Sequence, residues 1–253
     1  GGNIGVSVGP DGVFMIDDQY APLTEAIREA VRKLSDQPIR FVLNTHWHGD
    51  HTGGHENLGK AGALIVAHDN VRERLGTDQS MPFFGRDVPA SPAAALPVVT
   101  FSDALSFHLN GEDIRALHFP AAHTDGDAVV HFRGSNVVHM GDIYFNGLYP
   151  FIDSGSGGSI RGMVTAIDDV LPLMDADTRV IPGHGPLSNR EELAAYRNML
   201  ADVADRIGTL IAGGTDLAAI QAAAPTASYD ADWGGGFIDA ETWVRMIVED
   251  LSR

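Results

Sequence analysis

Short apolar runs separated by turn residues make up the first third of the chain. Two of them flank the turn Gly9-Pro10-Asp11-Gly12, which is typical of a β-hairpin. Apolar residues then recur at helical spacing from Leu23 to Leu34, and Pro38 ends that helix. The next run, Ile39–Leu43, is β-branched and aromatic, as expected of a buried strand. The pattern predicts strands at 4–8, 13–16, 39–43 and 63–67 and helices at 23–34 and 70–75.

Strands dominate the middle of the chain. Five apolar segments follow one another, with Asn-Gly, Asp-Gly and Arg-Gly among their connections, which favours an antiparallel meander. The segment before them, 76–97, is weakly periodic and rich in Pro and Ala. We interpret it as a long loop, either a flap over a site or a surface excursion. The predicted strands cover 98–101, 105–109, 114–119, 128–132 and 137–140.

Helices dominate the last part. Met163, Ile167 and Val170 mark one face of a helix over 160–174, and Asn189 with Glu192 forms a capping box for a long helix. No repeat and no linker divides the chain. We therefore expect a single domain over 1–253 with an α/β (α+β) fold, two sheets back to back and helices outside. A strand at 179–181 and shorter helices at 216–223 and 239–251 complete the pattern.

Composition excludes several classes of function. The 253 residues include no cysteine, so only His, Asp and Glu remain as strong metal ligands. The net charge of −17 disfavours nucleic acid and anionic membrane surfaces as partners and leaves a small-molecule substrate. No apolar run approaches the ~20 residues of a membrane span. The chain starts at Gly1 without a signal-like segment, so we expect a mature or trimmed protein.

Three imidazoles and a carboxylate fall within six positions, His46-Trp47-His48-Gly49-Asp50-His51, directly after the strand at 39–43. A strand cannot aim these side chains at one point, because its side chains alternate between faces. A tight loop can, and Gly49, Gly53 and Gly54 supply the backbone freedom. Neutral imidazole and carboxylate are ligands of zinc and similar first-row metals. The stretch therefore predicts a metal site rather than a polar turn that happens to be rich in histidine.

Three further residues of ligand type share this setting in loops after apolar strands: His123, Asp142 and His184. Together the seven exceed what one tetrahedral zinc ion uses. They suit two ions about 3.5–4 Å apart that share a carboxylate and a hydroxide.

The other histidines lack the loop-end setting, and we expect them at the surface or in cross-strand contacts: His55, His68, His108, His118, His131 and His139. Asp125 and Asp127 are interpreted as turn formers. Asp17 and Asp18 follow a strand, and we interpret them as turn residues or a helix lead-in rather than as partners that orient a ligand.

The combination of these motifs resembles the metallo-β-lactamase superfamily over nearly the whole chain. The resemblance implies an αββα sandwich with two metal ions at one edge of the sheets. It implies that His46, His48 and His123 bind the first ion, that Asp50, His51 and His184 bind the second, and that Asp142 bridges them. The implied cofactor is two Zn²⁺, with Fe or Mn as alternatives. Asp50 is the implied catalytic residue, which takes up or relays the proton of the shared water.

The superfamily hosts several kinds of hydrolase and some oxidoreductases, so the resemblance leaves the substrate open. Asp142 and Phe145 stand where the commonest zinc β-lactamases carry Cys and Lys, which disfavours β-lactams as main substrates. We expect a dinuclear zinc hydrolase in which a shared hydroxide attacks an ester, lactone or amide carbonyl. β-Lactams would be at most secondary substrates with low activity. The alternatives are a phosphodiesterase of the same fold and a metal-binding or sulfur-handling protein without hydrolytic turnover.

Two loops carry large apolar residues that either line a substrate pocket or simply pack on the core: Met81, Phe83, Phe84, Tyr149 and Phe151. Relatives with this overall pattern are often exported, so the resemblance favours a periplasmic or secreted protein.

Overall fold

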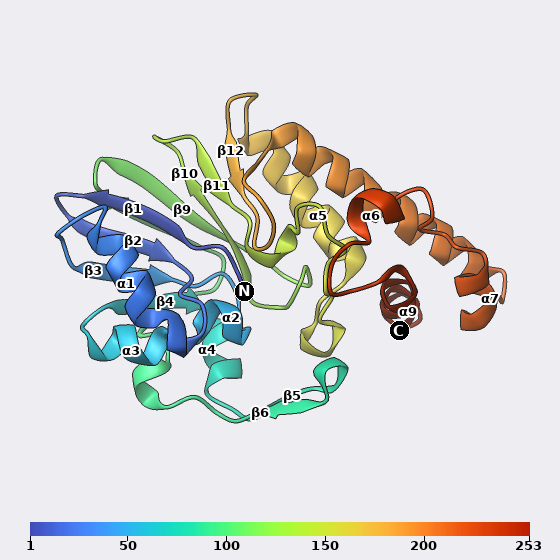
Figure 1. The fold of residues 1–253 in the computed structure, drawn as a ribbon, viewed down its shortest axis with the longest axis horizontal. Helices are drawn as coiled ribbons and strands as arrows, with labels where there is room; N and C mark the ends of the chain where they lie inside the picture. Colours follow the sequence, from blue (N-terminus) through green and yellow to red (C-terminus); the bar gives the residue numbers. More distant parts are fainter. The chain divides into compact units, whose positions relative to one another are not determined.

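The structure is a computed structural model that describes residues 1–253, and the chain forms two compact units (Figure 1). Unit 1 comprises Gly1–Phe119 and Gly126–Gly141, and unit 2 comprises Pro120–Asp125 and Asp142–Arg253. Organisation as a single domain stays a prediction.

The first sheet of unit 1 brings the ends of its parallel strands to one edge. β1 pairs antiparallel with β2 across the predicted hairpin, and every other pairing in the sheet is parallel. Ile16 pairs with Leu43, so β2 and β3 end at the same level, and β4 continues two residues beyond Val66, the partner of Leu43. The loops that follow β2 and β3 therefore start side by side. The sheet order is β1 (Gly5–Gly9), β2 (Gly12–Ile16), β3 (Ile39–Leu43), β4 (Leu64–His68) and β7 (Val99–Phe101).

The predicted meander forms the second sheet of unit 1. Four of the five predicted strands pair antiparallel in chain order, which confirms the meander for them. The prediction is wrong for the strand at 98–101, which is β7 and pairs parallel with β4 in the first sheet. The turn between β8 and β9 contains Asn110 and Gly111 with positive φ, as a two-residue hairpin loop requires. The strands are β8 (Ala104–Leu109), β9 (Glu112–Phe119), β10 (Asp127–Phe132) and β11 (Val137–His139).

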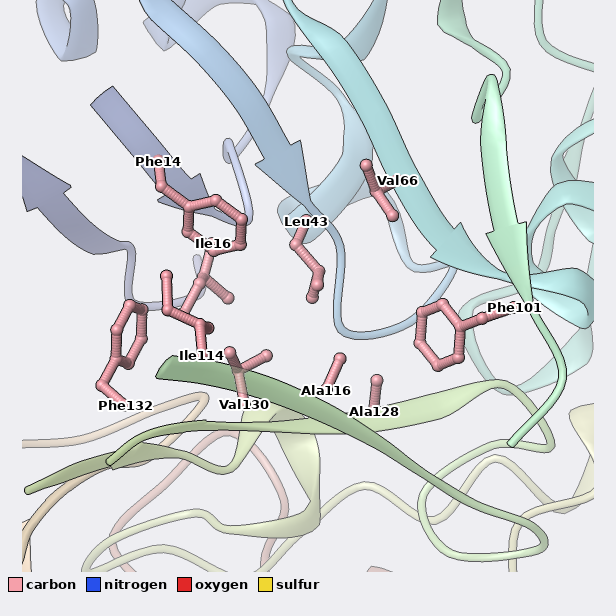
Figure 2. Packing of buried hydrophobic residues seen from close by; sticks show 10 residues of the cluster. All are labelled: Phe14, Ile16, Leu43, Val66, Phe101, Ile114, Ala116, Ala128, Val130 and Phe132. Carbon is pink, nitrogen blue, oxygen red and sulfur yellow. The ribbon is translucent and has the colours of Figure 1, made fainter. Parts of the chain in front are cut away.

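The core of unit 1 lies between these two sheets. Phe14, Ile16 and Leu43 point from the first sheet toward Ile114 and Val130 of the second (Figure 2). Strand alternation explains this, because every second residue of each strand faces the partner sheet. Phe14 is 1% exposed, and its ring lies 4.8 Å from that of Phe107 in an edge-to-face contact.

Helices cover the other face of the first sheet. Val13, Met15 and Val42 point away from the second sheet and pack with Val31 of α1 and Leu58 of α3. The amphipathic pattern at 23–34 therefore reflects one buried helix face. The helices of this unit are α1 (Thr24–Arg32), α2 (Gly49–Thr52), α3 (His55–Lys60) and α4 (Asp69–Leu75).

The prediction of a long loop over 76–97 is wrong for its first half. Residues 79–88 form an antiparallel hairpin of β5 (Gln79–Met81) and β6 (Arg86–Val88), joined by the 3₁₀ turn Pro82–Phe84. In Figure 1 the hairpin projects beyond the helices of unit 1. Strands of three residues are too short to show alternation, which is why the pattern missed them.

Unit 2 is mainly helical. Its long helix α6 packs against α5 and α9 (Figure 1) and begins where the capping box predicts, since the Asn189 side chain accepts a hydrogen bond from the Glu192 amide at 3.0 Å. No helix in the chain combines the length and apolarity needed to cross a bilayer. The elements are α5 (Ile160–Val170), β12 (Arg179–Ile181), β13 (Ser188–Asn189), α6 (Arg190–Ala212), α7 (Leu217–Ala222), α8 (Asp230–Trp233) and α9 (Ala240–Leu251).

The Phe14 ring should be a main contributor to the stability of unit 1. Phe14→Ala should lower the free energy of unfolding by about 3–5 kcal/mol, because it removes a buried ring that contacts Phe107 and Phe132. Urea denaturation followed by circular dichroism measures the change. Phe84→Ala is the control, since Phe84 is 43% exposed and its loss should cost less than about 0.5 kcal/mol. Equal losses in the two variants would contradict this view of the core.

Candidate metal centre

Four of the seven predicted ligands lie on the loop that follows β3 and on the helical turn α2 at its end, and we call them the first ligand group: His46, His48, Asp50 and His51. The loop tightens into α2 because the His48 carbonyl accepts hydrogen bonds from the amides of His51 and Thr52, at 3.0 and 3.1 Å. Nε2 of His46 lies 3.1 Å from Nδ1 of His48, and the rings of His46 and His51 are 4.2 Å apart. The backbone thus gathers side chains that a strand would have separated.

The donor atoms of the first ligand group fit a divalent first-row cation. Two ligands at ~2.05 Å from a tetrahedral zinc ion lie about 3.4 Å apart. The His46–His48 nitrogen pair is separated by 3.1 Å, and Nε2 of His51 lies 3.7 Å from Oδ2 of Asp50. Thr45 Oγ1 donates to Asp17, so it accepts from Nδ1–H of His46, and the lone pair of that imidazole is on Nε2.

Asp17 orients the first ligand group. The sequence analysis had favoured the interpretation of Asp17 as a turn residue or helix lead-in over this role. Its carboxylate is 1% exposed and accepts hydrogen bonds from Asn44 Nδ2, the Thr45 amide and the Thr45 hydroxyl. Its Oδ2 also accepts from Nδ1 of His51 at 2.7 Å. This bond directs Nε2 of His51 away from Asp17 and makes the imidazole a better ligand. Asp17 follows β2 directly and has a φ of 61°, so it is a turn residue as well.

Asp18 and His55 form a second buried pair beneath the loop. Asp18 Oδ1 accepts a hydrogen bond from the Gly54 amide at 2.9 Å, and its Oδ2 lies 3.8 Å from Nε2 of His55. Burial raises the pKa of Asp18 well above its usual value and lowers the pKa of His55 to about 4. Burial therefore disfavours the charged form of both groups, and His55 is neutral near pH 7. The expectation of a surface or cross-strand position is wrong for His55, which is fully buried at the start of α3.

Gly2 is a residue near the site that sequence reasoning missed. Its backbone lies so close to the His51 ring that a Cβ at this position would collide with Cε1. The Gly2 carbonyl accepts a hydrogen bond from the Gln19 side chain, which holds the segment in place. No periodic pattern marks such a contact, because it depends on a glycine that packs against a residue 49 positions away.

The other three predicted ligands belong to unit 2, and we call them the second ligand group: His123, Asp142 and His184. Oδ2 of Asp142 lies 3.6 Å from Nε2 of His123 and 3.3 Å from Nε2 of His184. The three residues come from separate segments of the chain, yet both imidazoles approach the same oxygen of Asp142. Asp142 therefore occupies the bridging position between the two imidazoles, with the spacing expected of ligands to common ions.

The His123 loop is held from several sides. Nδ1 of His123 donates to the Phe151 carbonyl at 2.8 Å, so its lone pair is on Nε2, which faces Asp142. The Ser159 amide, at the start of α5, donates to the Ala122 carbonyl at 2.8 Å. Gly162 of α5 passes so close to the Ala121 carbonyl that a side chain would clash there. The helix start thus positions a predicted metal ligand.

His184 is positioned by the segment that follows Asp142. The ring of Phe145 stacks on the His184 imidazole with centroids 4.9 Å apart and an angle of 15°. The amide of Asn146 donates to the His184 carbonyl at 2.9 Å, and the Gly183 amide donates to the Tyr144 carbonyl at 3.0 Å. Phe145, three residues after Asp142, therefore orients a predicted ligand by stacking.

The remaining histidines lie outside the groups of side chains that could hold an ion. His108 and His131 are at least partly exposed, as expected. His68 and His118 stack with centroids 3.5 Å apart, and His139 is buried with Nε2 donating to the Asn3 carbonyl. Asp125 and Asp127 are likewise outside these groups.

The five candidate pocket residues have different surroundings. Tyr149 is buried, stacks on Trp243 at 4.1 Å and donates its hydroxyl hydrogen to Asp230 at 2.8 Å. Phe151 is buried, and its ring centroid lies 5.9 Å from that of His123. Met81 is buried at the end of β5, directly before the turn, whereas Phe83 and Phe84 in the turn are 38% and 43% exposed. Their place in a substrate pocket stays a prediction.

Comparison with known protein families identifies the chain. The model of the metallo-beta-lactamase superfamily matches residues 1–207, a range that includes all seven residues of the two ligand groups. The chain belongs to the metallo-β-lactamase superfamily. The sequence-based recognition is thereby confirmed.

Two curated proteins with different names match this chain in sequence. A linear primary-alkylsulfatase of Pseudomonas sp. is 26% identical over 230 residues, which covers 76% of this chain and 43% of the relative. A hydroxyacylglutathione hydrolase of Nitrosococcus oceani is 28% identical over 162 residues, covering 63% of this chain and 54% of the relative. The chain spans about half the length of the curated relatives it matches.

Comparison with solved structures shows the fold of this chain. A double mutant of the sec-alkyl sulfatase PisA1 superimposes with a TM-score of 0.75 at 17% identity, over 98% of this chain and 47% of that chain. A metallo-beta-lactamase from Pontibacter korlensis gives a TM-score of 0.63 at 19% identity, over 78% of this chain and 86% of that chain. The fold is the α/β metallo-β-lactamase fold of two mixed sheets flanked by helices, as predicted.

Asp17→Asn should weaken metal binding at His51. The amide keeps the shape of the side chain but cannot supply the carboxylate that orients the imidazole, so affinity should fall by about 10–100-fold. Competitive titration of zinc against a chromophoric chelator measures this. Asp36→Asn, at an exposed position, is the control and should leave the affinity unchanged. Identical zinc affinity in Asp17→Asn and the unaltered chain would refute the orienting role.

Proposed function

We propose that the two ligand groups together hold two divalent cations. His46, His48 and His123 would bind one ion, Asp50, His51 and His184 the other, with Asp142 as the shared ligand. The observation that carries the proposal is the position of the Asp142 oxygen between two imidazole nitrogens within unit 2. The short separation of the His46 and His48 nitrogens within unit 1 supports it independently. Zinc suits the imidazole and carboxylate donors best, with iron or manganese as the alternatives.

The proposed activity is hydrolysis by activated water. Two such cations, when bound, lower the pKa of water from ~15.7 toward ~7 and polarise the bond to be cleaved. Asp50 is the residue that would accept or relay the proton of the attacking water, since its side chain is 20% exposed and can exchange that proton with solvent. Asp17 and the Phe151 carbonyl hold His51 and His123 with their Nδ1 atoms occupied, which keeps the ligand set ordered.

An ester, lactone or amide carbonyl is the substrate class that we propose first. The hydroxyacylglutathione hydrolase among the relatives supports a hydrolase of this kind. Asp142 and Phe145 replace the Cys and Lys that favour β-lactams, so β-lactam turnover should be weak.

A sulfate ester is the second candidate substrate. Two independent comparisons, one of sequences and one of structures, found an alkyl sulfatase, and the structural match extends over 98% of the chain. Attack at the sulfur or carbon of a sulfate ester requires the same activated water, so the ligand groups accommodate either substrate.

Removal of single ligands tests the hydrolytic function. His184→Gln and Asp142→Asn should each lower kcat/KM by at least about a hundredfold, because the stabilisation lost is several kcal/mol. His108→Gln is the matched control, since the side chain of His108 is 77% exposed, and it should keep full activity. Chelation followed by zinc should abolish and then restore turnover. Activity that survives both chelation and His184→Gln would contradict the proposal.

A substrate panel distinguishes the candidate functions. It should contain a p-nitrophenyl ester, a lactone, a thioester, a chromogenic cephalosporin, an alkyl sulfate and bis-p-nitrophenyl phosphate. We expect turnover on a carbonyl ester or on the alkyl sulfate, with metal analysis giving two zinc ions per chain. Turnover confined to the phosphodiester would establish the phosphodiesterase alternative. Two bound zinc ions without turnover on any compound would refute hydrolysis and favour a metal-binding or sulfur-handling protein.

A further inference from the structure

The His123 loop, Pro120–Asp125, has a backbone conformation that needs support from its surroundings. Ala121 has a φ of 55°, a left-handed conformation that is unfavourable for a residue with a Cβ atom. Such a conformation persists only where the surrounding structure imposes it. The contacts that hold this loop therefore determine where the imidazole of His123 lies. Several of them come from residues 149–160, which we call the support segment.

Three hydrogen bonds fix His123 and the residue before it to the support segment. Nδ1 of His123 donates to the Phe151 carbonyl at 2.8 Å. The Asp153 amide donates to the His123 carbonyl at 3.2 Å. The Ser159 amide donates to the Ala122 carbonyl at 2.8 Å. The position of the imidazole therefore depends on the position of the support segment.

Asp250 of α9 caps the start of α5, where the support segment ends. Its Oδ2 accepts a hydrogen bond from the Ile160 amide at 2.8 Å. Ser159, the residue before α5, makes no capping bond with its own side chain, and the first turn of α5 contains no acidic residue. Asp250 therefore satisfies an amide of the first helical turn and places a negative charge at the positive end of the helix. This bond is one residue away from the Ser159 amide that holds Ala122.

Two further contacts join α9 and the residues just beyond it to the support segment. Arg253 donates hydrogen bonds to the carbonyl of Ser154 and, at 2.9 Å, to its hydroxyl. The ring of Trp243 stacks on that of Tyr149 with centroids 4.1 Å apart. Ser154 directly follows the residue whose amide bonds the His123 carbonyl. Tyr149 lies two residues before the carbonyl that accepts from the His123 imidazole. Each contact is thus next to, or close to, one of the three bonds that hold the loop.

α9 is itself fixed in the core of unit 2. Trp243 and Ile247 are fully buried, and the helix packs against α6 and α7. Asp250 follows Trp243 by seven positions, about two helical turns, so both lie on one face of the helix. The superfamily model matches residues 1–207, and α9 lies outside this range. The family pattern therefore does not account for these contacts.

We propose that α9 is a positioning element for His123, in which Asp250 and Arg253 fix the support segment that holds the His123 loop. Both are positioning residues, because their side chains bond the support segment rather than the substrate or the metal ions. The inference rests on the proposed function, since it takes His123 as a ligand of one of two zinc ions. It deepens that function, because the affinity for this ion then depends on a helix outside the matched family region.

Hydrogen exchange of the full chain, measured after chelation, tests the support without any metal. Asp250→Ala removes the acceptor of the Ile160 amide, so residues 120–125 and the support segment should exchange about tenfold faster. Exchange in α6 should not change. Asp250→Asn keeps an acceptor oxygen and should restore most of the protection. Glu249→Ala is the matched control, because Glu249 is the neighbouring acidic residue of α9 and is exposed.

Zinc binding provides the second readout. Competitive titration against a chromophoric chelator should show that Asp250→Ala weakens the binding of one of the two zinc ions by about tenfold, because His123 is no longer held in place. Asp250→Asn and Glu249→Ala should keep the affinity of the unaltered chain for both ions. Arg253→Gln should weaken the same ion as Asp250→Ala does. Circular dichroism of each variant checks that the helices are retained.

The outcomes distinguish this inference from the proposed function. Exchange of the His123 loop that is equal in Asp250→Ala and Glu249→Ala would overturn the positioning role even if the protein is a zinc hydrolase. Faster exchange that extends equally through α6 would also overturn it, since the effect would then be a general loss of stability. Faster exchange confined to the loop and the support segment, with unchanged affinity for both zinc ions, would keep the support and contradict His123 as a ligand.

Discussion

A single buried carboxylate holds the first ligand group in place. Asp17 accepts hydrogen bonds from Asn44, from Thr45 and from the His51 imidazole, so it ties the end of β2 to both ends of the histidine loop. This depends on the parallel pairing of β2 with β3, in which Ile16 lies opposite Leu43. The sheet core between Phe14, Ile114 and Val130 fixes that pairing. The hydrophobic core of unit 1 thereby positions a polar site at its edge.

Imidazole nitrogens and carboxylate oxygens gather closely in both ligand groups. In unit 1 two imidazole nitrogens lie 3.1 Å apart, and in unit 2 two more lie within 3.6 Å of one Asp142 oxygen. Hydrogen bonds to Thr45, Asp17 and the Phe151 carbonyl occupy the opposite nitrogens of His46, His51 and His123. Imidazoles oriented in this way are suited to bind a metal ion through the nitrogen that faces the group. The membership in the metallo-β-lactamase superfamily agrees with this chemistry.

The long elements and the candidate ligands could be found in the sequence because both leave local signals. Alternation and turn dipeptides located the meander, and three histidines within six positions marked the loop after β3. Short elements such as α2 and the hairpin over 79–88 escaped, because three or four residues cannot show a period. The role of Asp17 depends on Thr45, 28 residues away, and the burial of His55 depends on Ala95. Contacts of this kind exist only after the fold has formed.

Anomalous diffraction from crystals of the zinc-loaded chain would test the central claim most directly. The account predicts two zinc peaks about 3.5–4 Å apart. One should lie beside His46, His48 and His123 and the other beside Asp50, His51 and His184, with Asp142 reaching both. Zinc peaks at other residues, or two ligand groups that bind no common pair of ions, would contradict it.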